Sequence, residues 1–145
     1  MNAKEYSQMV DQSSKKSPIL RDVLAAYGVG GLICVFGQLL FEWYSSLGMK
    51  EIDARTLVSV TLIFAAAVLT GFGIFDKIAK FAGAGTLVPI TGFANAVVSP
   101  AIEFKPEGYV LGVAAKMFTI AGPVIVYGTL ASVIYGIIYW IMRMI

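Results

Sequence analysis

The 145-residue sequence contains no histidine and a single cysteine, Cys34. These counts exclude a Cys/His metal cluster, a Ser/His or Cys/His nucleophile pair and an internal disulfide. No other acid–base or nucleophile pair is visible, so we expect neither an enzyme nor a resident cofactor or metal. Cys34 lies in a long apolar run, where we interpret it as a small buried residue, with a reactive thiol as the alternative.

Charge is also scarce. Charged residues make up 14% of the chain and hydrophobic residues 58%, whereas soluble domains are about 25% charged. A water-soluble domain of this length buries only about two thirds of its surface and would expose large apolar patches. The 11 Lys+Arg and 9 Asp+Glu include no long basic run, which argues against nucleic acid as a partner. The composition therefore predicts an integral membrane protein surrounded by the lipid bilayer.

Three uncharged runs are long enough to cross a hydrocarbon core of about 30 Å as helices, which rise 1.5 Å per residue. They cover residues 23–41, 56–75 and 117–142. Residues 1–22 form a polar tail before them, and we interpret residues 23–145 as a single transmembrane domain. The predicted fold class is an all-α integral membrane protein with three to four transmembrane helices.

A fourth uncharged run, residues 81–102, contains several helix-breaking residues and predicts a broken or re-entrant segment packed against other helices. Half-helices at membrane depth present unsatisfied N–H groups, which several transporters use to hold anionic substrates. The candidate solute path or gate consists of Gly83, Gly85, Pro89, Thr91 and Asn95. The alternative is a glycine-rich packing element with satisfied hydroxyls. Lys116, within a later apolar run, either extends to an interface or lines the path.

Positive charge predicts the orientation of the chain. Six basic residues lie before the first span or after the second: Lys4, Lys15, Lys16, Arg21, Lys77 and Lys80. Only two, Lys50 and Arg55, lie in the loop between these spans. The positive-inside rule therefore places the N-terminal tail in the cytoplasm. A crossing by residues 81–102 would put Arg143 inside and a re-entrant loop would put it outside, and the sequence leaves both open.

Small residues recur four apart on the first and last spans. The predicted helix-packing positions are Ala26, Gly30, Cys34 and Gln38 on the first, and Gly128, Ser132 and Gly136 on the last. Such faces allow helices to approach closely in lipid, where apolarity alone drives no association. The partner is either another helix of the same chain or another subunit.

Three stretches resemble a known family. They are Gly30-Gly31-Leu32-Ile33-Cys34 with Gly37-Gln38, LTGFGIFDKIAKFAGAGTLVPITGFANA from Leu69 to Ala96, and EGYVLGVAAKMF from Glu107 to Phe118. From about residue 25 to 138 the chain resembles the stage V sporulation protein AC family (SpoVAC), with SpoVAEb as the close paralogue.

The resemblance implies a subunit of the spore complex that moves dipicolinic acid, as its calcium chelate, into the developing spore and out at germination. It implies a location in the inner membrane of the forespore or spore, with other stage V A-complex subunits as partners. A chain with three or four spans is too thin to enclose a solute path alone, so a channel requires a homo- or hetero-oligomer. The alternative function is a non-conducting scaffold subunit that anchors partner proteins.

Overall fold

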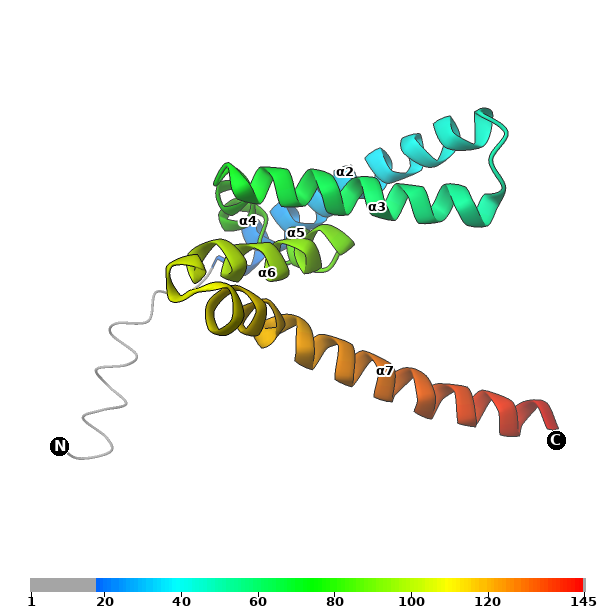
Figure 1. Ribbon diagram of the computed structural model, residues 1–145. Helices are drawn as coiled ribbons and strands as arrows, with labels where there is room; N and C mark the ends of the chain where they lie inside the picture. The colour runs from blue at the N-terminus through cyan, green and yellow to red at the C-terminus, as the bar shows by residue number, and fades with distance from the viewer. Residues whose placement is uncertain (1–17, 145) are drawn as a thin grey trace.

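The computed structural model describes residues 18–144, and within that range every regular element is a helix (Figure 1). Three stretches are long and apolar enough to span a membrane: α2 (Ile19–Ser46), α3 (Glu51–Gly71), and Tyr109–Met144, which contains α7 (Ala115–Met144). With 28, 21 and 30 residues, α2, α3 and α7 are about 42, 32 and 45 Å long. These helices confirm the predicted all-α fold class. Of the predicted polar tail, residues 1–17 lie outside the described residues, and residues 19–22 form the first turn of α2.

The helices α2 and α3 form an antiparallel hairpin whose turn contains Gly48, at φ +83°. The hydroxyl groups of Tyr44 and Thr61 join the two helices in a 2.9 Å hydrogen bond. Arg55 adds a second contact near the turn, since its guanidinium lies 5.4 Å from the centre of the Phe41 ring. The turn end of this hairpin is therefore held by one hydrogen bond and one cation–π contact.

The third helical stretch consists of short pieces: α4 (Phe75–Ala82), α5 (Ala84–Leu87) and α6 (Ile90–Glu103). The helix α3 ends at Gly71 rather than at the predicted residue 75, because the chain turns at Gly73, whose φ is +67°. With 8 and 14 residues, α4 and α6 are about 12 and 21 Å long, and neither can cross a bilayer alone. The predicted broken segment is thus three helical pieces.

The direction of α6 makes the segment re-entrant. Thr91, at the start of α6, lines a cleft with Leu62 of α3, and Asn95 contacts Thr70 near the end of α3. The helix α6 therefore runs parallel to α3, back toward the end of the bundle where α4 begins (Figure 1). After a 3₁₀ turn (Lys105–Glu107) and a π-helical turn (Tyr109–Ala114), α7 leaves from this end. The C-terminal end of α7 lies on the side of the α2–α3 turn.

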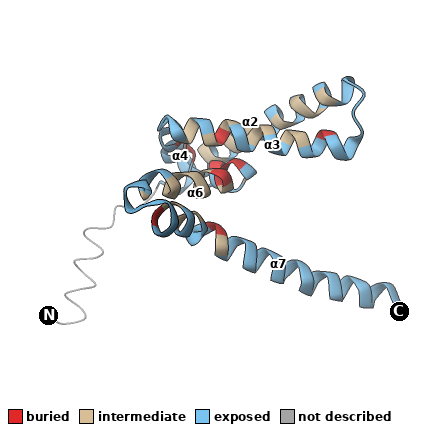
Figure 2. Ribbon diagram, in the orientation of Figure 1, coloured by how far each residue is buried: buried red, intermediate tan, exposed pale blue. Residues whose placement is uncertain are grey.

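Burial is concentrated around this re-entrant hairpin, α4 to α6 (Figure 2). Ala66, Phe75 and Ala94 form a small core where α3, α4 and α6 meet. Burial of residues 81–102 is partial, since Val88 at the hairpin tip remains 84% exposed. In α7 only Ala121 is buried, and the helix is exposed from Pro123 onward. The long exposed helix faces are apolar, as a lipid environment requires.

Candidate functional site

The candidate site begins where α5 crosses α2. Gly85 of α5 lies so close to the α2 backbone that a Cβ atom on it would overlap the carbonyl oxygen of Ala26 and lie 2.8 Å from the Ala26 Cα. A Cβ on Gly30, one turn further along α2, would lie 3.3 Å from the Gly85 carbonyl oxygen. The two backbones can approach this closely only because both contact positions lack bulky side chains. The structure thus brings Ala26 and Gly30 together with Gly85.

The breaks on either side of α5 come from Gly83 and Pro89. Gly83 has φ +51°, in the region that residues with a side chain rarely adopt. Pro89 precedes the first residue of α6, with extended backbone, and no side chain caps that helix. The first N–H groups of α6 therefore lack a side-chain acceptor at the tip of the hairpin.

Two threonines lie buried beside this tip. The hydroxyl of Thr86 donates to the carbonyl oxygen of Gly83 at 3.0 Å. Thr91 is 7% exposed, and its hydroxyl is the one buried side-chain oxygen or nitrogen among residues 18–144 without a hydrogen-bond partner. Both threonines line an otherwise apolar cleft of about 260 Å³ between α2, α3 and α4. A buried hydroxyl without a hydrogen-bond partner lowers the free energy of unfolding by about 1–3 kcal/mol, so such groups are rare in native proteins.

Asn95 lies on α6 one turn beyond Thr91 and joins this helix to α3. The Thr70 hydroxyl lies 2.9 Å from Asn95 Oδ1 and 2.8 Å from the Ala66 carbonyl oxygen, so its single proton is shared between them. The contact fixes the half-buried Asn95 amide against the end of α3. Sequence reasoning singled out Asn95 but missed Thr70 and Thr86, because hydroxyl groups within helices usually bond their own backbone.

Lys116 lies apart from these residues. Its ammonium nitrogen is 4.2 Å from the centre of the Phe104 ring, just beyond the C-terminal end of α6. Thr91 and Phe104 are separated by 13 positions, or about 20 Å along the helix direction. Lys116 therefore stacks on an aromatic ring at the open end of the hairpin, away from the tip.

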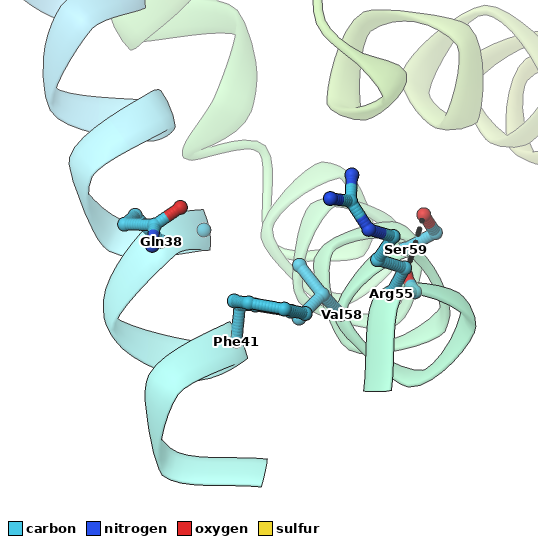
Figure 3. A pocket seen from close by; sticks show the side chains of 6 residues that line it. Gln38, Phe41, Arg55, Val58 and Ser59 are labelled. Carbon is cyan, nitrogen blue, oxygen red and sulfur yellow. Dashed lines mark hydrogen bonds between the residues drawn. The ribbon is translucent and has the colours of Figure 1, made fainter. Parts of the chain in front are cut away.

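Two other positions on α2 lie outside the α5 crossing. Cys34 is exposed, which corrects its interpretation as a buried residue. The close α5 contact ends at Gly30, so Cys34 only borders an open groove that also includes Pro89. Gln38 donates to Glu42 at 3.1 Å on its own helix. It also lines a groove of about 300 Å³ with Phe41, Arg55, Val58 and Ser59 (Figure 3).

The predicted packing positions on α7, Gly128, Ser132 and Gly136, are exposed and have no contact with another helix of the described chain. A Cβ atom built on Gly128 or Gly136 would meet nothing within 4 Å. The Ser132 hydroxyl donates to the Gly128 carbonyl oxygen at 2.8 Å, within the same helix. Of the two small-residue faces, the structure therefore pairs only the one on α2 within the chain.

Together the three long apolar helices and the hairpin define a multi-pass helical membrane protein with a re-entrant element. In residues 18–144 no group of three or more Cys, Asp or Glu side chains could hold a metal ion. A family model described as SpoVAC/SpoVAEB sporulation membrane protein matches residues 22–138. The chain is also 48% identical over 139 residues to "Stage V sporulation protein AC" of Bacillus subtilis (strain 168), covering 94% of this chain and 93% of that protein.

No solved structure matches the chain. The family match spans the hairpin and the three long helices and confirms the resemblance carried by the sequence motifs. The protein therefore belongs to the SpoVAC/SpoVAEB family of sporulation membrane proteins. This is not a known enzyme family.

Proposed function

We propose that the protein is a subunit of the membrane complex that carries dipicolinate, with calcium, into the developing spore and releases it at germination. Its membership of a sporulation membrane family and its similarity over nearly full length to a stage V sporulation protein support this assignment. The proposed location is the inner membrane of the forespore or spore, and the proposed partners are other stage V A-complex subunits.

The solute path in this proposal passes the tip of the re-entrant hairpin, at Gly83, Gly85, Pro89, Thr91 and Asn95. The observation that carries it is the buried hydroxyl of Thr91, which has no partner in the described chain. The N-terminus of α6 has no side-chain cap, and although the Gly92 N–H donates to the Pro89 carbonyl oxygen, the N–H groups before it and the positive dipole end are available to a dicarboxylate. The cations Lys77, Lys105 and Lys116 lie at the open end of the hairpin, where they would attract an anion.

The path forms between subunits in this proposal, as a homo- or hetero-oligomer. Three spanning helices cannot surround a solute, and α7 is exposed along most of its length. The groove bordered by Gly30, Cys34 and Pro89 is also open to one side. A neighbouring subunit would supply the missing wall.

The test uses Thr91→Val and Asn95→Leu in a sporulating strain, with Thr56→Val as the matched control. Thr56 is exposed on α3 and its hydroxyl donates to the Ile52 carbonyl oxygen of the same helix, so its loss should leave transport unchanged. We expect both hairpin variants to insert and co-purify with partner subunits while spore dipicolinate content falls to that of a strain lacking the protein. Normal dipicolinate content in both variants would contradict the proposal.

The alternative function, a non-conducting scaffold subunit, is favoured by the exposed face of α7. A scaffold predicts that dipicolinate content falls only when co-purification with partners also falls. Measuring transport and assembly in the same variants therefore separates the two functions.

A further inference from the structure

A groove of about 400 Å³ separates the start of α2 from the end of α4. Ile19, Asp22, Val23 and Ala26 line one side, and Lys80 to Ala84 line the other. The four α2 residues are spaced three, one and three apart and so share one face of the helix. Gly83, at φ +51°, turns the chain from α4 into α5 and is one of the residues that line the groove.

The shape of the groove suits one end of an amphiphile rather than a solute. It is closed at its inner end, where the Ala26 and Gly85 backbones touch. From Ile19 to Ala26 it extends about 10 Å into the membrane from the end of the bundle. Two large apolar side chains of its lining, Ile19 and Phe81, are 75% and 62% exposed. A lipid is the amphiphile available at this depth.

The groove carries two opposite charges, Asp22 and Lys80, on its two sides. Within residues 18–144 the structure contains one ion pair, between Arg55 and Glu51, so neither charge has a salt-bridge partner there. Asp76 is one helical turn before Lys80 but does not pair with it. Charges at the edge of an apolar groove gain more from a counter-charge than fully hydrated ones do.

We propose that this groove binds the headgroup of a zwitterionic phospholipid with a primary amine, phosphatidylethanolamine. The Lys80 ammonium donates to the phosphate, and the lipid ammonium donates to the Asp22 carboxylate. The glycerol headgroup of phosphatidylglycerol offers hydroxyl donors but no positive charge to Asp22, and the quaternary amine of phosphatidylcholine carries the charge but cannot donate a hydrogen bond. The groove shares Gly83 with the proposed solute path, but Thr91 lines a different cleft, and the lipid contacts rest on Asp22 and Lys80, which that path does not use.

The test is native mass spectrometry of the full chain, titrated with dioleoyl phosphatidylethanolamine, phosphatidylglycerol and phosphatidylcholine. We expect phosphatidylethanolamine to be retained best, and Asp22→Asn and Lys80→Gln each to weaken its binding about fivefold. Asp76→Asn alters a neighbouring charge on α4 and Lys50→Gln an exposed charge at the α2–α3 turn; neither residue lines the groove, and these controls should bind as the unchanged protein does.

Two results would overturn the proposal. If Lys80→Gln weakens both phosphatidylethanolamine and phosphatidylglycerol equally and Asp22→Asn weakens neither, the groove recognises a phosphate alone. If neither variant changes the binding of any lipid, the retained lipid belongs to the non-specific lipid layer around the helices. All four substituted residues are exposed, so helical content measured by circular dichroism should confirm that each variant folds.

Discussion

Replacing Gly85 by alanine should open the α2–α5 crossing and destabilise the protein. The added Cβ atom would lie 2.8 Å from the Ala26 Cα and 2.9 Å from its carbonyl carbon, besides overlapping the carbonyl oxygen. Ordinary contact begins near 3.4 Å, so the backbones must separate by at least 0.6 Å (3.4 − 2.8). Both colliding groups are backbone atoms of packed helices, which cannot rotate away as a side chain could.

Overpacking of this kind costs about 1–3 kcal/mol, and the lost contact between the helices places Gly85→Ala at the upper end. For a chain of this size that corresponds to a fall in Tm of about 5–10 °C. Gly30→Ala needs a shift of only a few tenths of an ångström, because its Cβ would lie 3.3 Å from the Gly85 carbonyl oxygen. The gain of about 0.5–1 kcal/mol in helix propensity offsets that shift, leaving Tm nearly unchanged.

Gly31→Ala is the matched control. Gly31 is the chain neighbour of Gly30 on α2, and a Cβ atom there would meet nothing within 4 Å. This variant should keep the propensity gain and raise Tm by about 1–4 °C. Thermal unfolding in detergent, followed by circular dichroism, measures the series. A Gly85→Ala protein as stable as the Gly31→Ala protein would refute the close crossing.

Two further variants test the hairpin in the same assay. Thr91→Val keeps the shape of the side chain and removes the unpartnered buried hydroxyl. It should therefore raise the free energy of unfolding by about 1 kcal/mol. A lower free energy of unfolding would instead reveal a hydrogen bond to that hydroxyl. Gly83→Ala places a side chain at φ +51° and should lower stability by about 1–2 kcal/mol, whereas an unchanged Tm would argue against that turn.

The presence of three long apolar helices could be predicted from the sequence, since nineteen or more consecutive uncharged residues can form a membrane-crossing helix. The end of α3 could not, because residues 72–75 are as apolar as the helix before them and only the turn at Gly73 ends it. The breaks at Gly83 and Pro89 were predictable from residue type. The re-entry was not, since it depends on α6 packing against α3, a contact between distant parts of the chain.

The candidate site, like the fold, was only partly predictable from the sequence. The small face of α2 predicted a close contact, but the sequence could not show that Gly85 of the same chain is placed there and that Cys34 remains exposed. The sequence shows that Lys116 lies in an apolar run, but it does not show how far Lys116 is from the hairpin tip, because that distance depends on where α6 ends. Periodicity indicates which residues share a helix face, and only the turns between helices decide what that face meets.

The central structural claim is that the hairpin enters and leaves the membrane on one side. Thiol accessibility in sealed cells tests it most directly, with single cysteines at Lys77, Lys105 and Arg143 in a Cys34→Ala background. The re-entrant fold predicts that Lys77→Cys and Lys105→Cys react only after the cells are opened, while Arg143→Cys reacts with an impermeant reagent from outside. Reaction of Lys105→Cys from outside, with Lys77→Cys protected, would mean that residues 81–102 cross the membrane and would contradict the account.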